Sequence, residues 1–71
     1  MFDRLRTLRK QLADQEGVPP FVIFSDASLA EMAASLPQDR EAMLLINGVG
    51  RHKLEHYGDQ FLEAIQAGTD G

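Results

Sequence analysis

The stretch from residue 46 to residue 58, INGVGRHKLEHYG, combines a glycine turn with the beginning of a helix. Gly48 and Gly50 flank a single valine, and glycine tolerates the positive φ angles that a tight reversal of the chain requires. Backbone N–H groups at the start of the following helix can also bind a phosphate, and Arg51 and Lys53 would add positive charge there. Two interpretations stay open: a turn that only joins two packed helices, or one that also contacts a nucleic-acid backbone.

The second half of this stretch, HKLEH, matches the spacing of a zinc protease helix in which two histidines hold the metal beside a glutamate. A catalytic zinc needs a third protein ligand and a cleft, which a chain of this length hardly provides. Leu54 and Tyr57 mark the buried face of the expected helix, so His52, Glu55 and His56 should face solvent. We therefore expect neither a metal site nor catalytic residues here.

Outward from this stretch, apolar residues recur at intervals of three and four positions, as they do in amphipathic helices. The expected helical segments are 1–16, about 27–35, about 40–46, about 51 onward with Gly58 as a candidate interruption, and a last face at 61–65. In the segment 40–46, the predicted inner face consists of Ala42, Met43, Leu45 and Ile46. These segments predict an all-α fold, a compact bundle of about five short helices with a helix-hairpin-helix-like turn.

Residues that begin and end helices support these boundaries. Ser25 or Asp26 and Asp39 are plausible N-terminal caps, and Gly17 is a natural C-terminal stop. The apolar run FVIF at residues 21–24 follows two prolines and has no partner strand in the sequence. We therefore expect an irregular or 3₁₀ turn packed on the core.

The composition limits the function classes. The 71 residues allow one domain, and the absence of cysteine excludes disulfides and thiolate zinc sites. No apolar run approaches the length of a membrane span, and no signal peptide is visible, so we expect a cytoplasmic protein. No local motif pairs a histidine with a serine nucleophile. The sequence thus gives no indication of an enzyme.

The charge is unevenly distributed along the chain. Residues 1–10 carry a net charge of +3, whereas residues 11–71 carry −7. Arg6, Arg9 and Lys10 on the first helix are candidate phosphate contacts, and Phe21 could stack on a base. The acidic remainder attracts DNA poorly, but it could dock on a basic protein surface.

Taken in order, LRKQLADQEGVPPFVIFSDASLAEMA (residues 8–33), INGVGRHKLEHYG (46–58) and FLEAI (61–65) resemble the HRDC domain, the helicase and ribonuclease D C-terminal module. The variety at the C-terminus of bacterial RecQ DNA helicases is the most similar. The resemblance implies a five-helix HRDC domain over residues 1–67, with a flexible tail at 68–71. It implies no catalysis and no cofactor in this domain; the parent helicase would use ATP, magnesium and zinc.

The resemblance also implies a role. HRDC domains help their helicase engage DNA, often weakly and through single strands or junctions, and the expected partners are the other domains of the parent and such DNA. The isolated domain should be monomeric. An alternative is an acidic regulatory module that docks on the helicase core or on a partner. By position, the DNA-binding candidates are Arg6, Arg9, Lys10, Phe21, Gly48, Gly50, Arg51 and Lys53, with Phe21 standing where a tyrosine is common.

Overall fold

The computed structural model describes residues 1–69, and all its regular secondary structure is helical over these residues. The elements are α1 (Phe2–Glu16), α2 (Pro20–Ile23), α3 (Asp26–Ser35), α4 (Arg40–Leu44), α5 (Arg51–Lys53), the π-helical turn η1 (Leu54–Gly58) and α6 (Asp59–Thr69). The predicted all-α bundle is confirmed. None of the helices in residues 1–69 has the length and apolar character needed to cross a membrane.

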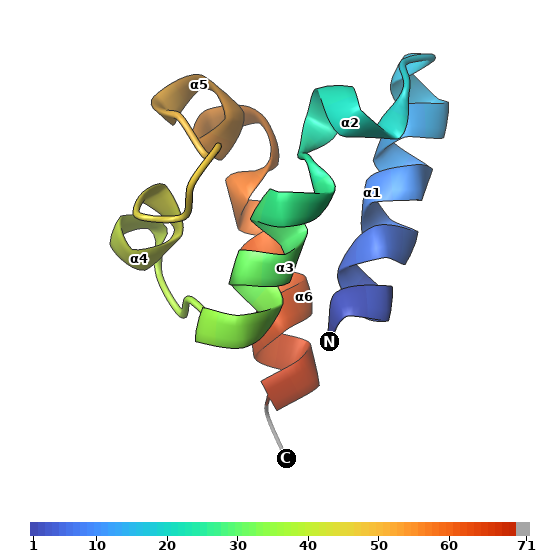
Figure 1. The fold of residues 1–71 in the computed structure, drawn as a ribbon. Coiled ribbons are helices and arrows are strands. Elements are labelled where there is room, and N and C mark those ends of the chain that lie inside the picture. Colours follow the sequence, from blue (N-terminus) through green and yellow to red (C-terminus); the bar gives the residue numbers. More distant parts are fainter. Residues whose placement is uncertain (70–71) are drawn as a thin grey trace.

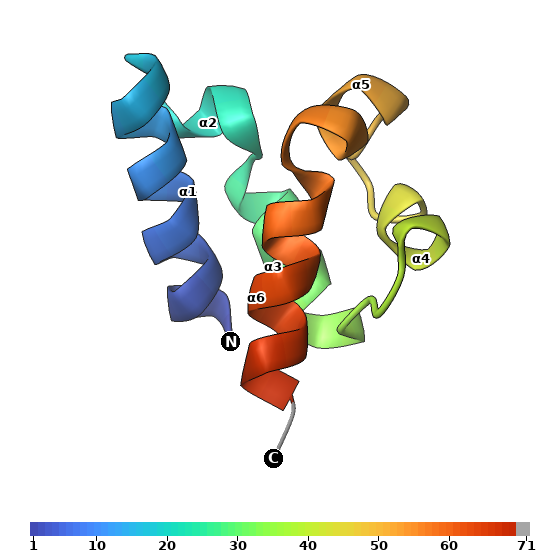
Figure 2. The same ribbon diagram turned by 180° about the vertical axis from the view of Figure 1, so that it is seen from behind.

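Helix α1 packs against α2, α3 and α6, while α4 and the α5–η1 segment lie on the other side of α3 (Figure 1). The view from behind shows α1 and α6 next to each other and the N-terminus near the end of α6 (Figure 2). Helix α6 continues to Thr69, two residues beyond the predicted boundary at residue 67. The rest of the predicted tail, 70–71, lies outside the described residues.

Two phenylalanines lie at the centre of the core. Phe24 and Phe61 are fully buried, and their rings meet edge to face with centroids 4.9 Å apart, which is a favoured aromatic geometry. Phe24 lies at the end of α2, so the FVIF segment anchors the α1–α3 connection as predicted. The segment forms one α-helical turn, however, and not a 3₁₀ or irregular one. The other large, fully buried side chains are Leu5, Ile23, Leu29, Met32, Met43 and Ile65.

The predicted caps set the helix ends. The Ser25 side chain accepts a hydrogen bond from the N–H of Ser28, and the Asp39 carboxylate accepts one from the N–H of Ala42. These bonds satisfy amides that the first turn of a helix leaves unpaired. Gly17 ends α1 in the left-handed conformation at φ 68°, where a side chain would be disfavoured.

The prediction that Leu45 faces the core is wrong. Its side chain is 85% exposed, whereas Met43 and Ile46 are buried as predicted. Helix α4 ends at Leu44, and the next two N–H groups bond three residues back, to Ala42 and Met43. This tighter turn changes the direction in which each side chain points, so the helical spacing no longer applies at Leu45.

Gly58 does not interrupt the last helix. Helices α5 and α6 are continuous through η1, in which the chain widens by one residue. A β-carbon at Gly58 would overlap the side chain of Leu54. The glycine therefore allows Leu54 to pack beneath the wide turn.

Candidate nucleic-acid interface

The glycine turn is attached to α3 by hydrogen bonds on both sides of Asn47. The hydroxyl of Ser28 donates to the Asn47 carbonyl oxygen at 2.7 Å, and the Asn47 N–H donates to the Glu31 carboxylate at 2.9 Å. Gly48 follows at φ 90°, and a β-carbon there would overlap the Ser28 hydroxyl. Gly48 is therefore needed for the packing of the turn on α3.

The positive charges after the turn differ in their surroundings. Arg51 is exposed, whereas Lys53 is half-buried with its ammonium 5.8 Å from the centre of the Phe24 ring. Gly50 has an ordinary φ of −87° and precedes α5, a helix of only three residues. The carboxylate of Glu31 occupies the side of the turn next to α3. The turn thus offers one exposed cation to a phosphate, with an acidic group close by.

On α1, Arg6 and Lys10 are exposed and line one groove together with Pro20 at the start of α2. Each cation has a carboxylate near it. Arg6 lies 3.8 Å from Asp3, and Lys10 lies 3.3 Å from Asp14. Exposed pairs of this kind are weak, so both cations can exchange their partner for a phosphate.

Arg9 does not lie on this exposed surface, and its placement corrects the sequence-based expectation. The residue is only 8% exposed. One guanidinium nitrogen donates to the carbonyl oxygen of Phe24 at 3.0 Å, and the other contacts the Asp26 carboxylate at 2.8 Å. Arg9 therefore ties α1 to the α2–α3 connection, and its charge is already matched.

Phe21 extends away from the core. It is 69% exposed, and its neighbour Val22 is 41% exposed, although both lie in the helical turn whose other end carries the buried Phe24. Phe21 directly follows Pro20, which lines the groove with Arg6 and Lys10. A free aromatic ring next to two exposed cations is the arrangement that binds single-stranded nucleic acid by stacking and charge.

The structure thus brings Arg6, Lys10 and Phe21 to one surface, which we call the α1–α2 surface. The turn at Gly48 and Gly50 belongs to a different part, because α1 packs on α2, α3 and α6 (Figure 1). Lys53 lies between the two sets, over the ring of Phe24.

Comparison with known proteins agrees with this architecture. Residues 1–65 match the family model described as "HRDC domain". The chain belongs to the HRDC family. It is 53% identical over 66 residues to the ATP-dependent DNA helicase RecQ of Haemophilus influenzae and 49% identical over 67 residues to that of Bacillus subtilis. These matches cover 93% and 94% of this chain but only 11% of each helicase.

A solved structure shows the same fold. The third HRDC domain of D. radiodurans RecQ superposes with a TM-score of 0.94 at 34% identity, covering 99% of this chain and 92% of that one. The predicted five-helix HRDC fold is confirmed.

The two histidines of this HRDC domain lie on the outer face of the α5–η1 segment, as predicted. The rings of His52 and His56 are 4.6 Å apart. Within residues 1–69, no group of three or more His, Cys, Asp or Glu residues is arranged to hold a metal ion.

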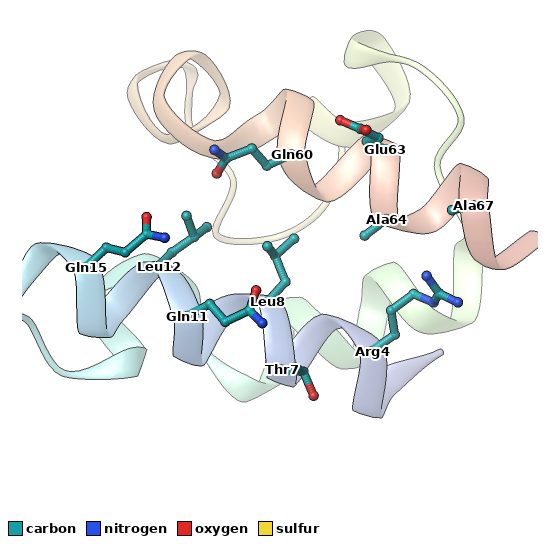
Figure 3. Close-up of a pocket in the computed structure, with 10 residues that line it drawn as sticks. All are labelled: Arg4, Thr7, Leu8, Gln11, Leu12, Gln15, Gln60, Glu63, Ala64 and Ala67. Carbon is teal, nitrogen blue, oxygen red and sulfur yellow. The ribbon is translucent and has the colours of Figure 1, made fainter.

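The sequence reading missed a second groove, which lies between α1 and α6 (Figure 3). Its floor is apolar, with Leu8, Leu12 and Ala64, and its rim carries three glutamines. Arg4 and Glu63 contribute opposite charges to it. These residues are spread over two helices far apart in the sequence, so no local motif marked them. The glutamines are Gln11, Gln15 and Gln60.

Proposed function

We propose that this HRDC domain is a non-catalytic auxiliary module of a RecQ-type DNA helicase, and that it adjusts how the enzyme binds DNA and selects among DNA structures. The family match and the similarity to two bacterial RecQ helicases support this proposal. The chain spans about a tenth of those proteins. ATP hydrolysis, with its magnesium ion, and any zinc site would reside in the remaining parts.

The observation that carries a direct contact with DNA is the exposure of Phe21 next to Arg6 and Lys10. The ring would stack on an unpaired base, and the two cations would contact the flanking phosphates. Binding should be weak and sensitive to salt, because both cations give up a carboxylate and because the domain as a whole repels DNA.

A second candidate function is docking on a protein surface, and the distribution of charge favours it. Four of the seven Lys and Arg residues lie within 4 Å of a carboxylate: Arg6, Arg9, Lys10 and Arg40. Little positive charge is therefore left free, while the formal net charge is −4. An acidic module of this kind would position itself on a basic region of the helicase or of a partner.

The direct contact is tested by fluorescence anisotropy of labelled single-stranded DNA at about 50 and 150 mM salt, concentrations between which phosphate contacts weaken measurably. Phe21→Ala and Arg6→Gln should each weaken binding several-fold. Arg4→Gln is the matched control, because it removes the same charge from the same helix but lies in the α1–α6 groove. Equal effects of Arg4→Gln and Arg6→Gln would show that only the net charge matters, and an absence of binding at the lower salt would exclude a direct role for the isolated domain.

The docking function is tested in the intact helicase. Removal of the domain should change the affinity for DNA or the preference among single strands, forks and junctions, even if the isolated domain binds no DNA. Unchanged affinity and preference on every substrate would exclude both forms of the proposal.

A further inference from the structure

An apolar surface remains open between α3 and α4. Leu45 is 85% exposed and Leu44 36% exposed, although both are aliphatic residues at the end of a short helix. Leu45 lines a hollow together with Pro37, Ala42 and Ile46. We call this the Leu45 surface. An exposed leucine beside an apolar hollow is typical of a contact with another protein.

The charges around the Leu45 surface have one sign. Glu31 lines the same hollow from α3, and Glu41 lies four positions before Leu45 along α4. The nearest cation in sequence, Arg40, is held by Asp59 through two hydrogen bonds of 2.9 and 2.6 Å. The leucine is thus bordered by carboxylates whose charge no neighbouring cation of α4 offsets.

We propose that the Leu45 surface docks on a protein surface in which an apolar pocket is bordered by arginine or lysine, located in another part of the polypeptide that contains this domain. The proposal rests on the docking function above and names its contact face. Nucleic acid does not fit, because Glu31 and Glu41 would repel phosphates. Charge complementarity selects a basic border, and the leucine selects an apolar pocket.

The small size of the surface explains why the partner should be part of the same polypeptide. One leucine with a few neighbours is far smaller than a standard interface between free proteins. A flexible link raises the effective concentration of the two sites to about the millimolar range, so that a weak contact becomes populated. Helicases similar to this domain are about nine times longer than the segment that it matches, which leaves room for such a partner.

Hydrogen exchange in the intact polypeptide tests the proposal. Amides in residues 41–47 should exchange at least threefold more slowly in the intact protein than in the isolated domain. Leu45→Ser should restore the faster exchange, and Glu41→Gln should do so in part. Because Leu45 is exposed, Leu45→Ser should leave the unfolding midpoint of the isolated domain unchanged, which separates lost docking from lost stability.

A photo-reactive residue in place of Leu45 provides a second readout. On irradiation it should cross-link within the same polypeptide, to a segment rich in arginine and lysine, whereas the same group at Gln11 should not. Equal exchange rates in both proteins, or cross-links from position 45 only to DNA or between separate molecules, would overturn the proposal. Phe21→Ala serves as the control for the DNA contact and should leave both readouts unchanged.

The outcomes separate this inference from the proposed function. If residues 41–47 are unprotected but removal of the domain alters DNA preference, the Leu45 surface is not the contact and the function stands. If they are protected but removal of the domain has no effect on any DNA substrate, the contact exists without the proposed role.

Discussion

The hydroxyl of Ser28 lies where a β-carbon on Gly48 would be, and it donates to the carbonyl oxygen of Asn47 next to it. Gly48→Ala should therefore destabilise the domain by about 1–3 kcal/mol from its φ of 90° alone, with an added cost from the overlap. Gly50→Ala is the control. Its φ is −87° and nothing lies within 4 Å of its added β-carbon, so it should change stability by less than about 1 kcal/mol in urea unfolding.

A combined variant separates the two costs at Gly48. Ser28→Ala removes the overlapping oxygen but leaves the Asn47 carbonyl without its donor. The double variant Ser28→Ala/Gly48→Ala should therefore lose less stability than the two single variants add up to. Strict additivity would show that the backbone angle alone sets the cost.

Arg9→Met should destabilise the domain by about 1–3 kcal/mol, because the buried carbonyl oxygen of Phe24 loses its donor while the volume of the side chain is largely kept. Arg6→Met on the exposed side of α1 should have an effect within about 0.5 kcal/mol. Urea unfolding followed by circular dichroism measures both. If Arg9→Met were as stable as the wild type and yet lost DNA binding, Arg9 would act at the DNA after all.

Tyr57 is the single tyrosine of the chain, and there is no tryptophan, so its ionisation can be followed directly near 295 nm. Burial raises the pKa of Tyr57, and the hydrogen bond that its hydroxyl donates to Glu16 raises it further. The titration midpoint should lie above 10. Glu16→Gln should lower it only in part, because burial is the larger cause; a midpoint that falls fully to 10 would contradict this order.

The same group predicts how stability changes in alkali. The folded pKa of Tyr57 lies above the unfolded value of about 10, so its contribution is complete below pH 10 and is lost as the pH rises through the folded pKa. Tyr57→Phe should remove this loss. Urea midpoints between pH 9 and pH 11 measure the difference between the two proteins.

Asp59 predicts the behaviour in acid. Its hydrogen bond with Arg40 lowers the pKa of the Asp59 carboxyl, and the pair links α4 to α6. Because the folded pKa is below the unfolded one, the contribution is complete above about pH 4 and is lost as the pH falls through the folded value. Asp59→Asn should flatten this part of the stability profile, and the effect should be small since both side chains are exposed. Identical acid profiles for the two proteins would contradict the linkage.

Sequence alone predicted the elements whose signals are local. Ser25, Asp39 and Gly17 act as caps and stops through bonds to residues three or four positions away, and such spacing is visible in one chain. Leu45 failed because α4 ends one residue earlier, and a short helix with a tight last turn does not keep its period. The end of a five-residue helix is decided by how the chain packs next, which the spacing of apolar residues does not contain.

The candidate interface was predictable in part. Arg6, Lys10 and Phe21 reach one surface because α2 folds back along α1. Arg9 was assigned to that surface from its charge, since a cation on an amphipathic helix usually faces water. Its partners, Phe24 and Asp26, are 15 and 17 positions away, and only the tertiary structure brings them to it.

The π-helical turn Leu54–Gly58 makes the length of this part of the chain as important as its residues. A relative one residue shorter here could form an uninterrupted α-helix, but everything before the missing residue would rotate by about 100° relative to α6. Tyr57 would then swing away from Glu16, and Leu54 away from the core that it partly covers. Deletions should therefore be accepted between α3 and α4, where residues 36–39 are non-helical, far more readily than between Lys53 and Asp59.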